Sequence, residues 1–230
     1  MSEQSTYNIR CPQCSLTQDV TLHDSVNVQA EPEMREQIMA NKLNAVTCEK
    51  CSFTFRVDKS LLYHDPQGNF MIHLIPGRED VIEATQARFS EWMRELGGML
   101  PAGIRAPDLH LVVSRAELVE RIFLLEAGLN ERVIEYIKYI IYSRNLERLA
   151  PESRALLFDT QDSTAEQLCF VIQDLESRNI EGVLHYSREA YTGLCEMFDR
   201  DDQTPSLMEL FPGPYVSARA LLLKEAQVDG

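Results

Sequence analysis

Two short cysteine motifs, Cys11-Pro12-Gln13-Cys14 and Cys48-Glu49-Lys50-Cys51, decide the N-terminal fold. Each motif leaves two residues between its thiols, so that one tight turn can direct both sulfurs at a single metal ion. The motifs are separated by 33 residues, and two such turns complete a four-sulfur tetrahedron. We therefore predict an N-terminal zinc ribbon in which one structural zinc ion is bound by Cys11, Cys14, Cys48 and Cys51.

The four-cysteine ligand set is closed, because it leaves no coordination position for a substrate or a catalytic water. The predicted zinc is therefore structural, and no catalytic residue is assigned to the site. An iron site of the rubredoxin or iron–sulfur type uses the same ligands and stays an alternative. A thioredoxin-like dithiol requires a CxxC at the start of a helix that follows a strand, and neither motif has that context.

The residues around the motifs predict a ribbon with an inserted helix over residues 1–77. Alternating apolar residues at Asp19–Gln29 indicate one or two strands, and Glu31-Pro32-Glu33 has the acids and proline typical of a helix start. Two more strands are predicted at Phe53–Leu62 and Phe70–Ile75, joined by a turn rich in Asp, Pro, Gly and Asn. The polar residues 2–8 are predicted to be a frayed tail.

The rest of the chain predicts two further regions. Residues 78–108 are expected to be a helix, at 79–96, followed by a linker rich in glycine and proline. Residues 109–230 are expected to form an α+β domain that opens with a short strand and a helical hairpin, with Ser114 and Asn130 as helix caps. Three apolar segments then predict an antiparallel sheet, at 155–158, 167–173 and 182–186. The whole protein is therefore predicted to be α+β.

Composition restricts the function classes. The formal net charge is −14, and so acidic a surface repels phosphate backbones and anionic lipid heads. The chain shows neither a signal-peptide pattern nor an apolar run of about 18 residues, so no membrane span is expected. We therefore expect a cytoplasmic protein, in which paired CxxC motifs are metal ligands rather than disulfides.

A family resemblance adds to this interpretation. The first knuckle at Cys11–Cys14, the second at Cys48–Cys51 and the segment Ser60–Pro66 resemble the bacterial CpXC domain, over about residues 7–135. Segments 126–130 and 133–138 also resemble longer members. The resemblance implies a zinc-ribbon-like domain that binds zinc, but the family has no established activity. One departure is Glu49, which stands where the motif has proline, and all four sulfurs are retained.

Other residues that could carry chemistry have simpler interpretations. Asp65 next to His64 resembles an acid-base pair, but Asp65 precedes a proline and a turn role is preferred. His23 and His73 are expected to be strand or surface residues rather than ligands. Cys169 and Cys195 lie among apolar neighbours and are expected to be buried, inert thiols.

Three functions remain open, and the first is preferred. The protein is predicted to be an interaction or scaffold protein that contacts a protein partner, with a second copy of the chain as an alternative partner. A stripe of tyrosines, Tyr136, Tyr139 and Tyr142, could form part of the contact surface. A nucleic-acid-associated regulator would need its basic residues on one face; these are Arg10, Lys42, Lys50, Arg56 and Lys59. An enzyme with its site in the C-terminal domain is the third hypothesis.

Overall fold

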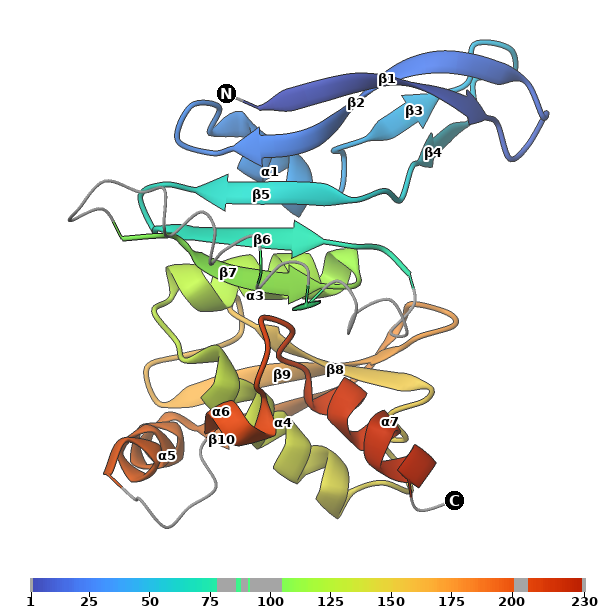
Figure 1. Cartoon of the computed structure of the whole chain (residues 1–230). Coiled ribbons are helices and arrows are strands. Elements are labelled where there is room, and N and C mark those ends of the chain that lie inside the picture. Colours follow the sequence, from blue (N-terminus) through green and yellow to red (C-terminus); the bar gives the residue numbers. More distant parts are fainter. Residues whose placement is uncertain (1, 78–85, 88–90, 92–104, 201–206, 229–230) are drawn as a thin grey trace. The chain divides into compact units, whose positions relative to one another are not determined.

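The computed structural model describes residues 2–77, 86–87, 91, 105–200 and 207–228 (Figure 1). The chain divides into two compact units, Met1–Val119 and Glu120–Gly230. Helices and sheets of mixed or antiparallel pairing make the protein α+β, as predicted. Most of the predicted helix at 79–96, and most of the predicted linker at 97–108, lie outside the described residues. No helix in the described ranges has the length and apolar character needed to cross a membrane.

The first unit contains a five-stranded mixed sheet with the strand order β1-β2-β5-β6-β7. Pairing is antiparallel within β1–β2 and β5–β6, and parallel within β2–β5 and β6–β7. The long strand β2 joins the sheet together, because its first part pairs with β1 and its last residues pair with β5. The strands are β1 Glu3–Arg10, β2 Thr17–Asn27, β5 Leu61–Asp65, β6 Phe70–Leu74 and β7 Asp108–Val112.

Two of these strands correct the sequence prediction. Residues 2–8 are not a frayed tail, because Glu3–Arg10 pairs along its whole length with β2. Only Tyr7 and Ile9 of β1 are apolar and half-buried, so the strand depends mainly on its main-chain pairing in the hairpin. The strand expected to open the C-terminal domain, β7, instead pairs with β6 in the first unit. Its last three side chains are buried there, which the local sequence could not reveal.

A small helix and a second hairpin complete the cysteine region. Helix α1, Glu33–Met39, follows Pro32 and carries acids in its first turn, and it buries Ile38. Strands β3, Ala45–Thr47, and β4, Thr54–Arg56, form a separate antiparallel pair. The inserted helix is therefore present between the two cysteine motifs, and it is seven residues long.

The predicted helical hairpin is formed by α3, Arg115–Glu126, and α4, Glu131–Arg144. Ser114 Oγ accepts the Glu117 N–H at 3.2 Å, while the Glu117 carboxylate accepts the N–H of Val113. Gly128 has a φ of 65°, a left-handed conformation that glycine adopts readily, and it ends α3. Asn130 caps α4 by accepting two main-chain N–H groups. These caps follow the sequence closely because capping is a local interaction.

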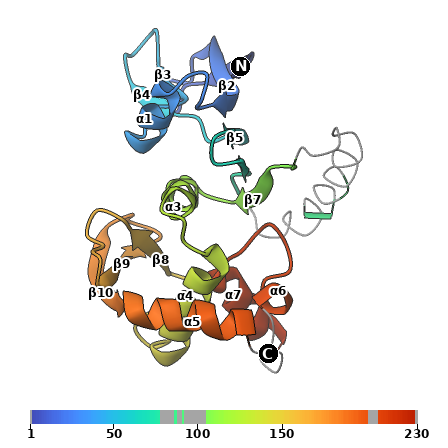
Figure 2. The same cartoon turned by 90° about the vertical axis from the view of Figure 1, so that its left-hand side faces the viewer.

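The second unit contains the predicted antiparallel sheet, with the order β10-β9-β8. Its strands are β8 Arg154–Asp159, β9 Gln167–Asp174 and β10 Ile180–Ser187. Helix α5, Arg188–Arg200, continues directly from β10, and Figure 2 shows α4 and α5 beneath the sheet. Two further helices, α6 Leu207–Leu210 and α7 Ala218–Val228, pack against α4.

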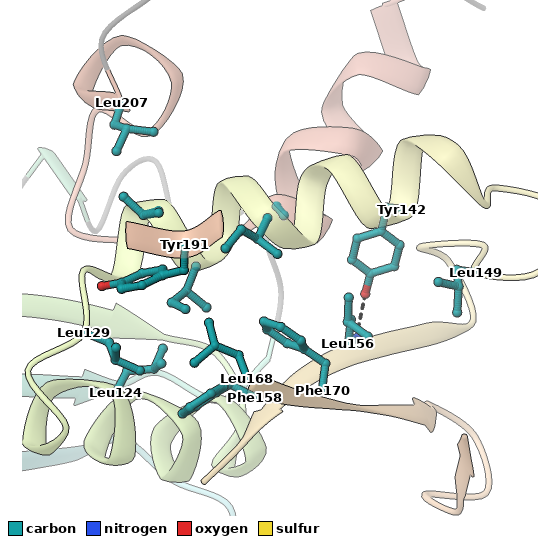
Figure 3. Close-up of a cluster of buried hydrophobic side chains, with 14 of the residues drawn as sticks. Leu124, Leu129, Tyr142, Leu149, Leu156, Phe158, Leu168, Phe170, Tyr191 and Leu207 are labelled. Carbon is teal, nitrogen blue, oxygen red and sulfur yellow. Dashed lines mark hydrogen bonds between the residues drawn. The ribbon is translucent and has the colours of Figure 1, made fainter. Parts of the chain in front are cut away.

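The core of the second unit lies between α4 and one face of this sheet (Figure 3). Leu168 and Phe170 of β9 are fully buried, as are Val133, Ile134 and Ile137 of α4. Burying each such side chain stabilises the fold by about 1.5–3 kcal/mol relative to leaving it exposed. The second unit therefore has an apolar core that involves none of the four motif cysteines.

Candidate metal centre

The structure brings the four predicted cysteine thiols together. Their sulfurs lie within 4.8 Å of one another, although the two motifs are far apart in sequence. Cys11 Sγ is 3.7 Å from Cys51 Sγ, and Cys14 Sγ is 3.5 Å from Cys48 Sγ. Tetrahedral Zn–S bonds of about 2.3 Å place sulfurs about 3.8 Å apart. The cluster therefore has the spacing that a tetrahedral thiolate metal site requires.

Two β-hairpins hold the cysteines. The first motif lies in the connection between β1 and β2, and the second lies in the connection between β3 and β4. Cys11 and Cys48, the first cysteine of each motif, are 1% exposed, while Cys14 and Cys51 are half-buried. Each hairpin thus contributes one buried and one half-buried sulfur to the same cluster.

The turns of the two motifs share a left-handed serine and a main-chain hydrogen bond. Ser15 and Ser52, which follow the second cysteine of each motif, have φ values of 60° and 56°. In both turns the serine N–H donates to the carbonyl oxygen of the first cysteine, at 3.0 and 2.9 Å. A left-handed conformation costs a non-glycine residue about 1–2 kcal/mol. Finding this strain twice, at equivalent positions, indicates that the surrounding structure imposes the turn.

Main-chain groups in the second turn stabilise negative charge on sulfur. The N–H groups of Cys51 and Lys50 outweigh the effect of burial and lower the pKa of the Cys48 thiol to about 6. For Cys51, the Phe53 N–H favours the thiolate, but burial and the neighbouring sulfurs dominate and raise its pKa to about 12. Without a cation, therefore, the cluster resists carrying several thiolates at once.

Gln18 of β2 positions the second motif, and sequence reasoning missed it. Its side chain is 8% exposed; the amide nitrogen donates to the Thr47 carbonyl at 3.2 Å, and the amide oxygen accepts the Glu49 N–H at 3.0 Å. Gln18, which belongs to the first hairpin, therefore binds Thr47 at the end of β3 and Glu49 in the second motif. Nothing in the local sequence distinguishes this glutamine, because its partners lie about 30 residues away.

The cysteine region lies within a stretch of the chain that matches a protein family. Residues 9–138 match the model of one protein family, described as CpXC protein. The chain belongs to the CpXC family. The match contains both cysteine motifs and α3, and it ends within α4. No curated protein and no solved structure matches the chain. The family assignment thus confirms the resemblance that the sequence predicts.

His23 and His73 of this CpXC protein have partners other than the sulfur cluster. The His23 ring lies 3.1 Å from the Gln4 side-chain nitrogen, and His73 Nε2 lies 2.7 Å from Ser60 Oγ. Next to His64, the carboxylate of Asp65 accepts the N–H groups of Gln67 and Gly68. These bonds are typical of a turn, so Asp65 has the predicted turn role.

The predicted tyrosine stripe faces inward or has partners within the second unit. Tyr142 is 1% exposed; its Oη accepts the Leu156 N–H at 2.7 Å (Figure 3) and donates to the Arg154 carbonyl at 3.1 Å. Tyr136 packs edge-on against Phe198 with ring centroids 5.0 Å apart. Tyr139 hydrogen-bonds to a glutamate of α7. The stripe is therefore a packing element and lends no support to an interface.

The remaining cysteines differ from the motif cysteines. Cys169 is buried as expected, but Cys195 is only half-buried. Cys169 lies within 4.8 Å of carboxylate oxygens of Asp159 and Asp162. Burial, and then these two carboxylates, raise the pKa of the Cys169 thiol.

A buried ionic network in the second unit was also missed. Lys138 of α4 is 3% exposed, and its Nζ lies 2.5 Å from Glu120 Oε1 and 2.7 Å from Glu135 Oε1. Glu120 also accepts the Phe158 N–H, and Glu135 accepts the Ala218 N–H. Beside them, Arg121 pairs with Glu131 and donates to the Val216 carbonyl; all of these charged side chains are buried.

Two carboxylates hold Lys138 in its charged form. Burial alone lowers the pKa of Lys138, but the carboxylates of Glu120 and Glu135 outweigh it and raise that pKa above its usual range. Burial raises the pKa of Glu120, and Lys138 opposes the rise. One sequence pattern could have indicated this network. Polar groups recur at helical spacing and lie on one face of α4, at Glu131, Glu135, Lys138 and Tyr142.

Proposed function

We propose that this CpXC protein is an interaction or scaffold protein whose N-terminal hairpins are fixed by one structural zinc ion. The observation that carries the proposal is the closed four-sulfur cluster, with separations of 3.5 and 3.7 Å in its two closest pairs across the motifs. Four soft thiolate ligands suit Zn²⁺, and a bound dication neutralises part of their charge. In this proposal the cysteine region is a zinc ribbon with α1 inserted between its two knuckles.

The small size of the β3–β4 hairpin favours a structural role for the metal. Strands β3 and β4 are only three residues long, so hydrogen bonding between them gives little stability. A structural zinc site contributes roughly 10 kcal/mol or more of apparent binding free energy, which can determine whether such a small region folds. All four ligand positions are taken by protein, so the zinc supplies cross-linking rather than Lewis-acid chemistry.

The net charge of −14 favours a protein partner over a nucleic acid. The basic residues that a nucleic-acid regulator would need are partly engaged: Lys59 pairs with Asp24, and Arg56 lies 3.9 Å from Asp58. The enzyme hypothesis stays a prediction, because the contacts of the described residues give it no support. A cytoplasmic location, predicted from the sequence, would keep the thiols reduced and available to zinc.

Elemental analysis of the full-length protein, purified without added metal, tests the zinc site. We expect about one zinc per chain. Cys11→Ser should abolish binding, whereas Cys195→Ser, a matched change outside the cluster, should not. Visible absorption distinguishes iron, because iron–thiolate centres are coloured and zinc–thiolate centres are not. A metal-free protein with four freely reactive motif thiols would overturn the proposal.

A further inference from the structure

Cys169 of β9 is buried, but it lies outside the apolar core of the second unit. Its neighbours Leu168 and Phe170 belong to that core, between the sheet and α4 (Figure 3). Successive side chains of a strand point to opposite faces of a sheet, so the Cys169 side chain lies on the other face. The residue is 0% exposed, and no described group hydrogen-bonds to its sulfur. The apolar core therefore does not explain why this thiol is buried.

The carboxylates of Asp159 and Asp162 lie beside this sulfur. One oxygen of each carboxylate and the Cys169 sulfur are all within 4.8 Å of one another. Neither aspartate has an ion pair with another described residue. Arg188, which reaches the connection between β8 and β9, donates through Nε to the Thr164 carbonyl instead. The fold therefore gathers three metal-ligand atoms, and the described residues place no cation among them.

The connection between β8 and β9 holds these groups in place. Ser163 Oγ accepts the Cys169 N–H at 2.9 Å and donates to the Asp159 carbonyl, so it joins the two strands beside the cluster. The Asp159 carboxylate also accepts the Gln161 N–H at 2.9 Å. Two of the three ligand atoms thus come from strand residues, and ligands on strands are held more precisely than ligands on free loops.

The sheet register places a histidine next to the cluster. Asp159 of β8 and His185 of β10 are both direct cross-strand partners of Cys169, from the two strands that flank β9. Directly paired residues point to the same face, with Cβ atoms about 4.5–5.5 Å apart. The His185 ring is exposed, lies outside the 4.8 Å cluster and makes no hydrogen bond to a described residue. Rotation of its side chain can therefore bring an imidazole nitrogen to the cluster.

We propose that a second metal ion binds to Asp159, Asp162 and Cys169 on this sheet face, with His185 as its fourth ligand. One thiolate, one imidazole and two carboxylates suit Zn²⁺, whereas Mg²⁺ and Ca²⁺ take oxygen ligands. Bonds of about 2.3 Å to sulfur and about 2.1 Å to oxygen place those atoms about 3.6 Å apart, within the 4.8 Å limit of the cluster. On binding, the Cys169 S–H bond breaks, the sulfur bonds to the metal as a thiolate and the proton passes to solvent.

This second site differs from the four-sulfur cluster in strength and does not depend on it. Asp162 and His185 are exposed, and the imidazole must move to reach the ion, so binding is weaker and the site fills when metal is added to the purified protein. None of its ligands belongs to the two cysteine motifs. A failure of the ribbon zinc and a failure of the second site are therefore separate results.

Titration of the purified full-length protein with cobalt(II) chloride tests the proposal. Cobalt(II) bonded to a thiolate absorbs in the near ultraviolet, so the cobalt–sulfur bond gives a direct signal. We expect about one further metal ion per chain and a near-ultraviolet band that excess Mg²⁺ does not remove. Cys169→Ser should abolish the band with an unchanged circular dichroism spectrum. Cys195→Ser, the matched change at the other cysteine of the second unit, should leave the band intact.

Substitutions of the exposed ligands complete the test without changing a buried residue. Asp162→Asn and His185→Gln should each weaken cobalt binding by about tenfold or more, because even an outer contact of a metal site contributes about 10- to 100-fold. Asp199→Asn, at an exposed aspartate of α5, is the control and should have no effect.

Four results would contradict the proposal. It is overturned if the band survives Cys169→Ser, if Asp162→Asn binds cobalt normally, or if Mg²⁺ displaces the cobalt, as it would from an exposed acidic surface. A band that is lost in Cys11→Ser but kept in Cys169→Ser would place the cobalt in the cysteine motifs and overturn it equally. An unchanged affinity in His185→Gln would remove His185 from the ligand set.

Discussion

The sulfur cluster and the ionic network of α3 and α4 hold buried or half-buried polar groups in two different ways. In the cysteine region the sulfurs lie beside one another, and the described residues supply no cation among them. In the second unit, Lys138 lies between Glu120 and Glu135, and Arg121 pairs with Glu131. The first arrangement requires a cation from solution, whereas the second is neutralised by the chain itself. We therefore expect metal removal to unfold the cysteine region, and the loss of a single charged side chain to destabilise the second unit.

The largest expected effect is the removal of metal. A strong chelator should unfold the two cysteine hairpins, because roughly 10 kcal/mol or more of apparent binding free energy is lost. Amide hydrogen exchange should rise around Cys11 and Cys48, while Leu168 and Phe170 in the core of the second unit keep their protection. Equal loss of protection in both units would show that the cysteine region does not depend on metal separately.

The next effect comes from removing the buried cation of the network. Lys138→Met leaves Glu120 and Glu135 buried without their partner and should lower the free energy of unfolding by about 3–5 kcal/mol. Lys42→Met, at an exposed lysine, should change it by less than about 0.5 kcal/mol. Chemical denaturation of both variants measures the difference.

A combined variant tests whether charge is the cause. Adding Glu120→Gln and Glu135→Gln to Lys138→Met removes all three charges, and the glutamine oxygens can still accept the N–H groups of Phe158 and Ala218. Most of the lost stability should return, because replacing a buried ionic group as a whole is often neutral. If the triple variant is as unstable as Lys138→Met alone, lost packing rather than unpaired charge explains the effect.

A smaller effect is expected where a neutral side chain supports the metal centre. Gln18→Ala removes both hydrogen bonds to the second motif and should lower zinc affinity by about 10- to 100-fold, as outer contacts of metal sites do. Competition with a coloured chelator measures this affinity. Gln29→Ala replaces an exposed glutamine of the same unit and should bind zinc normally. An unchanged affinity for Gln18→Ala would mean that the hairpins position the cysteines without it.

The smallest effect concerns a partly buried ion pair in the first unit, whose side chains are 14% (Lys59) and 28% (Asp24) exposed. Hydrogen bonds from Lys59, and then from Ser5 and Tyr7, lower the pKa of Asp24 from 3.8 to about 2. The pair therefore stabilises the fold fully above pH 4, and this stability is lost as the pH falls towards 2. Exposure limits the contribution to less than about 1 kcal/mol. Asp24→Asn should remove this part of the acid dependence, and an unchanged acid transition would contradict it.

Local features were predicted well from the sequence. The helix caps at Ser114 and Asn130, the turn at Asp65 and the strands of the second sheet depend on residues close to one another in the chain. Strand β1 was missed because its first four residues are polar and only Tyr7 and Ile9 alternate, and its pairing with β2 is what extends the strand over Glu3–Arg10. The sequence also could not show whether the tyrosines of α4 face a partner or the core, because helical spacing alone does not say which face of a helix is buried.

The four thiols and their arrangement in two turns could be predicted from the residues, because CxxC spacing fixes which sulfurs can reach one point. The α+β class and the CpXC resemblance could be predicted as well. The folded chain was needed to show that Gln18 supports the second turn and that charged side chains of α3 and α4 neutralise one another. Each of these depends on contacts between distant segments or on burial, and neither is encoded in local spacing.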